Sequence, residues 1–267
     1  MMTDAEAQLR AGNIASCLST LQNEIRSNPA DSKRRVFLAQ IYMLAGEWER
    51  AATQLSVIAE MDAGAIPMAH AYRTAIQCER LRASVFDGER SPLIFGDPEP
   101  WIALLVQSLA MLRAGRADDA ARLRDEAYES APTMLGAING TEFEWIADAD
   151  SRLGPILEVM LNGAYYWVPF HRISRIVMTP PEDLRDLVWL PAQLTWTNGG
   201  ESTGFIPVRY VGSETADDDA LRLARKTEWL PLGANAFAGQ GQRVLATSAV
   251  ETPLLEVREI ALRPVQA

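Results

Sequence analysis

Long apolar runs, cysteines, histidines and lysines are all scarce in this sequence of 267 residues. No stretch approaches the roughly 18 consecutive apolar residues of a membrane span. The start, MMTDAEAQLRAG, is acidic where a signal peptide would be basic. Cys17 and Cys78 are the two cysteines, which fit a reducing compartment and are too few for a disulfide framework. We therefore expect a cytoplasmic protein without membrane insertion.

Basic residues are too few and too scattered for polyanion binding. The net charge is −10, and only Lys33 and Lys226 are lysines among the 25 basic residues. Nucleic-acid binding depends on neutralising phosphates, and adhesion to an anionic membrane needs a basic amphipathic face. The sequence has neither a basic tract nor such a face, so we expect neither kind of partner.

Motifs of catalysis and cofactor binding are missing as well. The two histidines, His70 and His171, belong to no paired zinc-binding pattern. The sequence has no GxSxG elbow, no Walker loop and no GxGxxG that follows a strand and opens a helix. We expect no metal, no cofactor and no small-molecule substrate.

A repeated spacing organises the first half of the chain. Gly46 follows Gly12 by 34 residues, and Gly115 follows Gly46 by 69, about two further steps. Pro29 and Pro132 each lie 17 residues beyond a repeat glycine. A 34-residue helix–turn–helix period resembles the tetratricopeptide repeat (TPR), with glycine in the turn and proline after the second helix. The spacing predicts an N-terminal TPR-like α–α superhelix, with the missing repeat at residues 64–97; three unrelated helical hairpins are the alternative.

The second half is rich in aromatic residues, and its Gly, Pro and Asn residues are not spaced as in the first half. Gly154-Pro155 predicts a short helix through Leu161, and residues 182–190 predict another. Residues 164–170 favour a strand, Asn198-Gly199-Gly200 predicts a hairpin, and residues 238–241 resemble a loop. We expect a small α+β domain with mostly antiparallel strands, resembling a partial barrel. The chain is thus predicted to be multi-domain, with residues 1–133 helical and residues 134–267 α+β.

One polar cluster is a candidate for chemistry. Asp148, Asp150 and Arg152 lie close together beside Trp145, and carboxylate pairs can serve acid–base catalysis. We favour a structural junction, in which arginines pair with the carboxylates, because unpaired ions beside apolar residues are costly. The alternative is an enzyme with a site at this junction that includes His171.

Arg185 is assigned to the same junction. It lies in the segment DLRD, where it can pair with an aspartate on either side. A structural role is therefore the default for this arginine.

Four segments of the second half resemble the ImpE family, also called TagJ or SciE-type proteins. They are FEWIADADSRLGPILEV (143–159), YYWVPFHRISRI (165–176), PEDLRDLVWLPA (181–192) and IPVRYVGS (206–213). The resemblance implies a cytoplasmic, non-enzymatic accessory protein of a bacterial type VI secretion system. It implies binding to the N-terminal helix of the small sheath subunit, TssB, and through it a link to sheath recycling by ClpV.

The resemblance names a partner but no binding face. A helix ligand needs an apolar groove, and Phe37, Gln40, Ile41 and Met43 are the expected wall residues in the repeat half. Packing against the next repeat is the alternative for each of them. Tyr166 is a second candidate, because it alternates with Tyr165 and Trp167 along a predicted strand. The net charge favours a ligand helix with Lys or Arg at its edges.

Overall fold

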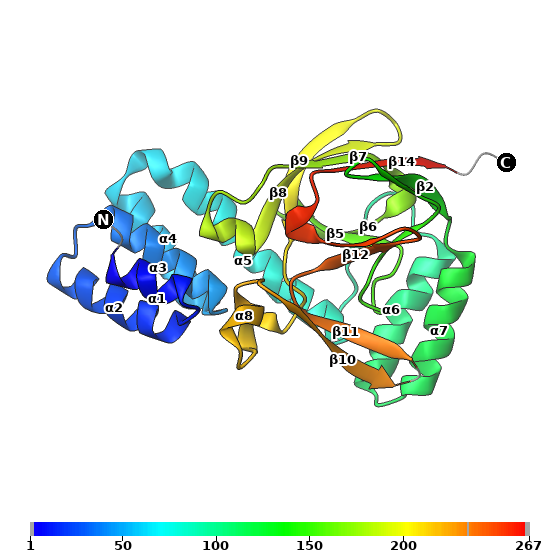
Figure 1. Cartoon of the computed structure of the whole chain (residues 1–267), viewed down its shortest axis with the longest axis horizontal. Coiled ribbons are helices and arrows are strands. Elements are labelled where there is room, and N and C mark those ends of the chain that lie inside the picture. Colours follow the sequence, from blue (N-terminus) through cyan, green and yellow to red (C-terminus); the bar gives the residue numbers. More distant parts are fainter. Residues whose placement is uncertain (1–2, 234, 265–267) are drawn as a thin grey trace.

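The computed structural model describes residues 3–233 and 235–264, with helices in the first half of the chain and strands in the second (Figure 1). We call α1–α4 the helical lobe, and the strands with their connections the sheet lobe. The α-helices are α1 (Asp4–Arg10), α2 (Ile14–Ser27), α3 (Ser32–Leu44), α4 (Trp48–Met61), α5 (Ile66–Phe86), α6 (Pro100–Arg113), α7 (Ala117–Ser130) and α8 (Asp219–Arg222). The 3₁₀ helices are η1 (Ala63–Ala65), η2 (Phe170–Arg172), η3 (Leu184–Leu187), η4 (Ser213–Thr215) and η5 (Leu254–Glu256).

The strands form three sheets. The large sheet has nine strands in the order β1-β6-β5-β9-β8-β7-β14-β2-β3, and smaller sheets join β13-β12-β4 and β10-β11. The strands are β1 (Leu93–Ile94), β2 (Met134–Ile138), β3 (Thr141–Phe143), β4 (Ile146–Asp148), β5 (Ile156–Leu161), β6 (Ala164–Pro169), β7 (Ile173–Met178), β8 (Trp189–Trp196), β9 (Glu201–Pro207), β10 (Thr227–Gly233), β11 (Ala236–Gly241), β12 (Val244–Thr247), β13 (Glu251–Pro253) and β14 (Glu259–Pro264).

Glycine turns close three helical hairpins, as the repeated spacing predicts. Gly12, Gly46 and Gly115 follow α1, α3 and α6 with φ of 82°, 71° and 71°. After each glycine, the next amide bonds a carbonyl five residues back, a Schellman arrangement that satisfies the helix end. These bonds are Asn13 N to Gln8 O at 2.9 Å, Glu47 N to Tyr42 O at 2.8 Å and Arg116 N to Met111 O at 2.9 Å.

The segment expected to hold the missing repeat differs from the other hairpins. Residues 64–97 contain the predicted helix, but it is a single helix of 21 residues, α5. The chain then forms β1, which pairs in parallel with β6 and so adds a strand to the sheet lobe. α5 runs between the lobes, and the α6–α7 hairpin lies at its far end, away from α1–α4 (Figure 1). The helices therefore do not form an uninterrupted row of equal hairpins.

The sheet lobe is antiparallel apart from the β1–β6 pair. The β8–β9 hairpin forms around Asn198-Gly199-Gly200 as predicted, with Thr195 opposite Glu201. Three local predictions were wrong: residues 156–161 form strand β5, residues 238–241 belong to β11, and 182–190 is helical only at Leu184–Leu187. All six residues of β5 are buried, so this segment has no polar face that would reveal its period.

Two apolar cores lie on opposite sides of the large sheet. One contains α1–α6 together with Tyr165, Trp167 and Trp189, so helices and strands share it. The other lies inside the curl of the sheet, where residues of β2, β5, β8 and β14 meet β12 and η5. Because the first core draws on both halves of the chain, the helical lobe is covered by the sheet lobe rather than merely tethered to it.

The glycine that ends α5 offers a test of how tightly α5 and α6 approach. Gly88 has a φ of 69°, and a Cβ there would lie 2.7 Å from the carbonyl oxygen of Leu109. Gly115 has a similar φ, but a Cβ there would meet nothing within 4 Å. We expect Gly115→Ala to lower the free energy of unfolding by about 1–2 kcal/mol, the cost of the left-handed backbone. Gly88→Ala should lower it by clearly more, and equal urea midpoints for the two variants would contradict the close approach.

Candidate functional site

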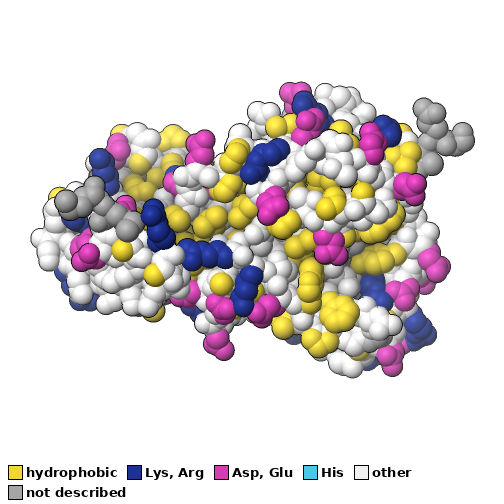
Figure 2. Space-filling model, viewed as in Figure 1, with side chains coloured by type: hydrophobic (Ala, Val, Ile, Leu, Met, Phe, Trp, Pro, Cys, Tyr) yellow, Lys and Arg dark blue, Asp and Glu magenta, His cyan; other side chains and the backbone are white. Residues whose placement is uncertain are grey.

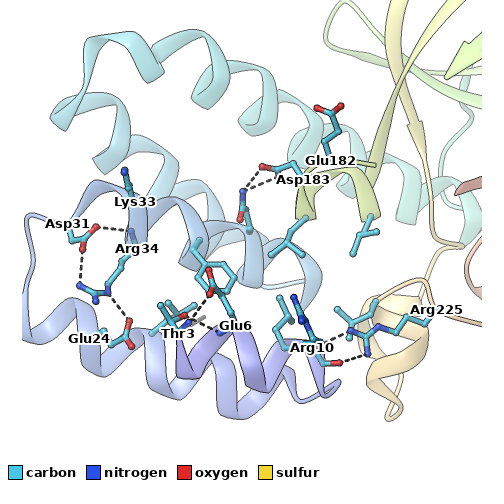
Figure 3. Close-up of a pocket in the computed structure, with 17 residues that line it drawn as sticks. Thr3, Glu6, Arg10, Glu24, Asp31, Lys33, Arg34, Glu182, Asp183 and Arg225 are labelled. Atoms are coloured by element: carbon cyan, nitrogen blue, oxygen red, sulfur yellow. Dashed lines mark hydrogen bonds and ion pairs between the residues drawn. The ribbon is translucent and has the colours of Figure 1, made fainter. Parts of the chain in front are cut away.

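A large groove opens between the helical lobe and the sheet lobe (Figure 2). Its lining comes from α1, α2 and α3 on one side, and from η3 and the segment after α8 on the other (Figure 3). The volume is about 1310 Å³, which exceeds the roughly 300–1,000 Å³ of small-molecule pockets. These dimensions favour a segment of polypeptide as the ligand.

Apolar side chains form the base and the middle of this groove. Leu9 and Leu21 are buried at its base, on α1 and α2. Phe37 of α3 and Leu184 and Leu187 of η3 are only half-buried, so they present apolar surface to the opening. Exposed apolar surface of this kind, with a polar edge, is typical of sites that receive an amphipathic helix.

The four wall residues expected on α3 divide into two pairs. Phe37 and Gln40 line the groove. Ile41 and Met43 do not, because both are fully buried, and this part of the prediction was wrong. The last seven residues of α3, from Leu38 to Leu44, are all buried because α2 and α4 pack beside the helix and the sheet lobe covers its end.

A polar link fixes η3, the opposite wall of the groove. Gln40 Nε2 donates to both carboxylate oxygens of Asp183 at 3.0 Å. Arg185 donates to the same carboxylate through Nε at 2.7 Å and Nη2 at 2.9 Å, and its guanidinium lies 4.6 Å from the ring centre of Tyr72. Arg185 thus pairs with Asp183 beside α3 and α5, and not with the Asp148–Asp150–Arg152 cluster to which the sequence analysis assigned it. Burial alone would raise the pKa of Asp183, but the hydrogen bonds from Arg185 and Gln40 lower it.

The second candidate surface is on strand β6. Tyr165 and Trp167 are fully buried, whereas Tyr166 is half-buried on the other face of the strand. The ring of Tyr166 meets Phe95 edge to face, with centroids 6.1 Å apart. Tyr166 therefore supplies a partly covered aromatic edge and no groove.

Asp150 is buried in the loop after β4. Arg152 donates to its two carboxylate oxygens through Nε at 2.9 Å and Nη2 at 2.6 Å, and the amide of Gly239 donates at 2.9 Å. The Arg152 guanidinium also lies 4.6 Å from the ring centre of Phe86, at the end of α5. This arrangement joins β11, the loop after β4 and the end of α5.

Both carboxylate oxygens of Asp148 also accept hydrogen bonds or pair with a cation. Its Oδ1 accepts from the Asp150 amide at 2.9 Å and from the Tyr210 hydroxyl at 3.0 Å, and its Oδ2 pairs with Arg243. Both carboxylates of the cluster are therefore held by donors. The acid–base interpretation loses the open carboxylates on which it depended.

The remaining members of the predicted junction lie apart from it. Trp145 is 44% exposed, so its assignment to a buried junction was wrong: it lies between β3 and β4, where its ring reaches solvent. His171 pairs through Nε2 with Glu99 Oε1 at 2.8 Å, in a separate cluster with Arg172. Burial lowers the pKa of His171, against the opposing effect of Glu99.

A buried ionic network, which no motif in the sequence predicts, joins the two halves at Glu158. Glu158 of β5 accepts from Arg82 of α5 through Nε at 2.7 Å and Nη2 at 3.0 Å. Arg243, just before β12, pairs with Glu158 and also with Asp148. Arg82 reaches Glu79 as well, at 3.2 Å. All of these charged groups are buried, and each is satisfied by a partner distant in sequence or by its own helix.

The charge of Glu158 depends on these arginines. Burial alone would raise the pKa of Glu158, but the positive charges of Arg82 and Arg243, with the hydrogen bonds from Arg82 and Tyr165, lower it to about 2. The Trp167 indole then donates to the Tyr165 hydroxyl at 2.7 Å, which extends the network into the shared core.

Side chains of the sheet lobe also complete the ends of helices in the helical lobe. Arg209 donates to the last carbonyls of α3, Leu44 O at 2.7 Å and Met43 O at 3.2 Å. Arg225 donates to Leu9 O and Arg10 O at the end of α1, and Asp219 accepts from the first amide of α2 at 2.8 Å. Cations at C-termini and an anion at an N-terminus match the helix dipoles. The groove walls are thus fixed from the side of the sheet lobe.

Within residues 3–233 and 235–264, no group of three or more His, Cys, Asp or Glu side chains is arranged to hold a metal ion. None of the described helices combines the length and the apolar character that a membrane crossing requires.

Comparisons with known proteins agree on one family. A profile described as "ImpE protein" matches residues 140–261. The chain is 46% identical over 263 residues to the "Type VI secretion system accessory component TagJ" of Pseudomonas aeruginosa, and the match covers 98% of this chain and 92% of that protein. The crystal structure of protein VPA1032 from Vibrio parahaemolyticus has a TM-score of 0.90 and 22% identity, with 98% of both chains covered. The last likeness concerns the fold alone.

The Arg152–Asp150 pair generates a stability prediction. The Arg152 side chain is 13% exposed and that of Asp150 is fully buried, so Arg152→Ala leaves a buried carboxylate without its cation. We expect a loss of about 2–4 kcal/mol in the free energy of unfolding, measured by urea denaturation. The exposed pair Arg263–Glu142, at 63% and 66% exposure, provides the control, and Arg263→Ala should cost about 0–1 kcal/mol. An unchanged midpoint for Arg152→Ala would show that the junction does not depend on this pair.

Glu158 generates a prediction about pH. Its pKa in the folded protein is about 2, below the ordinary 4.5, so its ionised form stabilises the fold above pH 4.5. That stabilisation should be lost as pH falls from 4.5 towards 2, a change of about 3 kcal/mol. Glu158→Gln should be less stable at pH 7, and its free energy of unfolding should fall less over the same range. Parallel pH profiles for the two proteins would contradict the low pKa.

Proposed function

The chain belongs to the ImpE/TagJ family of type VI secretion accessory proteins, and on that premise we propose that it is a non-enzymatic adaptor for a sheath subunit. Its partner is the N-terminal helix of the small sheath subunit, TssB, and that contact links the sheath to recycling by ClpV. The adaptor acts in the cytoplasm, where the sheath is assembled and disassembled. The observation that carries the proposal is the groove with its half-buried Phe37, Leu184 and Leu187.

The groove supports a helix as the ligand for a physical reason. An amphipathic helix buries its apolar stripe in an apolar channel and keeps its polar face in water. Here the apolar middle of the groove lies between polar margins on α3 and η3. In this adaptor, residues 1–133 act as a TPR-like unit and residues 134–267 as an α+β unit, with the groove between α1–α3 and the second unit.

Binding must be tested on the full chain. Residues of α1–α6 share one core with β5, β6 and β8, and Arg209 and Arg225 complete helix ends across the boundary. Either half alone would expose that core and lose those caps. An isolated half therefore makes a poor test of where a partner binds.

Phe37→Ala tests the groove as the binding site. A peptide of the host TssB N-terminal helix should bind the full chain in calorimetry, and Phe37→Ala should weaken it about tenfold or more, because a central aromatic anchor is lost. Trp145→Ala, which removes an exposed aromatic ring outside the groove, is the matched control and should bind like the unaltered chain.

Tyr166→Ala tests the competing surface on β6. Loss of binding in Tyr166→Ala, with unchanged binding in Phe37→Ala, would move the site to the sheet lobe and leave the adaptor role intact. No binding of the peptide or of whole TssB to the unaltered chain would overturn the proposed function itself.

A further inference from the structure

The two-stranded sheet of β10 and β11, which we call the ribbon, has one covered edge. Alternate backbone groups of β11 point away from β10, and groups of neighbouring segments bind them. These bonds are Phe237 O from Ser151 N at 2.9 Å, Gly239 N to Asp150 Oδ2 at 2.9 Å and Gly241 N to Ser213 Oγ at 2.8 Å. The β11 edge of the ribbon therefore has no room for another strand.

The β10 edge of the ribbon is open. Thr227, Trp229 and Pro231 lie opposite the three β11 residues whose backbone groups point outward. In an antiparallel pair, residues opposite each other at such positions both turn their N–H and C=O groups away from the partner strand. In the described part of the chain, none of these outward groups of β10 forms a hydrogen bond. Proline has no N–H, so Pro231 offers only its carbonyl.

β10 differs from the other edge strands of this protein. The edge strands β1, β3, β4 and β13 have two or three residues each, whereas β10 has seven. Short edge strands are a common protection against unwanted pairing with another chain. Residues 228–231 of β10 are all exposed, so no described residue covers this long edge.

Apolar side chains lie on both faces of the ribbon. Trp229 and Phe237 are 38% and 45% exposed and share one face, because Phe237 lies opposite Pro231, two residues from Trp229. Leu230 is 45% exposed and lies on the other face. Hydrophobic side chains gather over the ribbon in the lower part of Figure 2. A strand added to this edge would thus find apolar neighbours for both of its own faces.

The centre of β10 is uncharged. Lys226 and Glu228, at its start, pair with each other at 2.5 Å, and no charged residue follows Glu228 in the strand. A charged side chain opposite this centre would lose water without gaining an ionic partner. The edge therefore favours a ligand that is apolar and uncharged along its middle.

We propose that this edge receives an extended, uncharged segment of a partner protein, which adds an antiparallel strand beside β10. Thr227 and Trp229 each donate one hydrogen bond to that strand and accept one from it, and Pro231 only accepts. The apolar side chains of the segment pack on Trp229 and Phe237 on one face and on Leu230 on the other. Among the described residues, none of 227–233 lines the groove, so this site is separate from the one proposed for TssB.

A second copy of the chain fits this edge less well than a foreign strand. A two-fold axis at Trp229 puts Pro231 opposite Thr227, whose carbonyl then gains no donor. An axis at Leu230 has the same effect on the carbonyl of Trp229. An axis at Glu228 puts two carboxylates directly opposite each other, which is destabilising. A partner strand without proline satisfies all of the outward groups.

N-methylated peptides test the backbone pairing. The probe is an acetylated and amidated peptide with three Thr-Val repeats and a methyl group on every second amide nitrogen. It keeps one hydrogen-bonding edge and cannot build a sheet of its own. The control peptide has the same sequence with every amide nitrogen methylated. In calorimetry with the full chain, the probe should bind at least about tenfold more tightly than the control peptide.

Amide hydrogen exchange, followed by NMR, locates the contact. The Thr227 and Trp229 amides should exchange fast in the free chain and clearly more slowly when the probe is bound. The Leu230 amide faces β11, so its exchange should change little.

Two substitutions at Trp229 separate the ring from the backbone. Trp229→Ala removes the ring and keeps the outward amide, and it should weaken probe binding about tenfold. Trp229→Pro also removes that amide, and it should weaken binding by a further factor of about two to ten. Phe37→Ala is the matched control, because it removes an aromatic ring of the groove and should bind the probe like the unaltered chain. Thermal midpoints establish that the variants fold.

Each outcome supports or contradicts strand addition. Equal binding of the two peptides, or equal affinities of Trp229→Ala and Trp229→Pro, would overturn it. So would a failure of the probe to bind and to slow exchange of the Thr227 and Trp229 amides. Dimerisation of the unaltered chain in sedimentation, abolished in Trp229→Pro, would make a second copy the occupant and contradict the proposed partner. A failure of the TssB peptide to bind concerns the groove alone.

Discussion

The buried carboxylate of Glu158 is the constraint on which the arrangement of the two lobes depends. It lies on β5, an interior strand of the large sheet, and its two cations come from different parts of the chain, Arg82 from α5 and Arg243 from the segment before β12. A buried ion that loses one partner costs several kcal/mol, so α5 cannot move away from β5 without exposing or stranding a charge. Arg243 also pairs with the buried Asp148, so Asp148 cannot move away without stranding a charge. Asp148 in turn lies next to the loop in which Arg152 binds Asp150. Since only the short η1 separates α5 from α4, this pairing also restricts the position of the helical lobe.

The groove is a consequence of that arrangement, because its walls belong to different lobes. Its helical wall is made of α1–α3, whose ends are completed by Arg209, Arg225 and Asp219 of the sheet lobe. Its other wall, η3, is held by Asp183 through Gln40 of α3. Rigid walls reduce the conformational entropy that is lost when a partner binds. The same contacts explain why the boundary near residue 133 separates two patterns of sequence but not two independent cores.

The parts of the fold that the sequence predicted are those with local causes. The turn glycines Gly12, Gly46 and Gly115 require a left-handed backbone, and the Asn-Gly-Gly hairpin is a turn signal in itself. The helix expected at residues 155–161 is wrong because Gly-Pro is typical of a helix start, while the five apolar residues and the buried Glu158 of β5 show no alternation that would indicate a strand. The Arg152–Asp150 pair could be predicted from the sequence because its members are two residues apart. The Arg82–Glu158 and Arg243–Asp148 pairs join residues 76 and 95 positions apart, and nothing in either neighbourhood indicates the partner.

The net charge of the chain does not predict the charges at the groove, because these depend on where each charged side chain lies. The net charge of −10 governs the electrostatic attraction felt by a partner that is still distant, and it repels acidic chains and favours basic ones. A ligand that has reached the groove is governed instead by the few charges within a Debye length of it. Among the described residues of the groove, Glu24 and Asp31 share Arg34 and Asp183 pairs with Arg185, whereas both carboxylates and cations remain that form no ion pair. The net charge of the whole chain therefore does not determine which charge a ligand of this groove must carry.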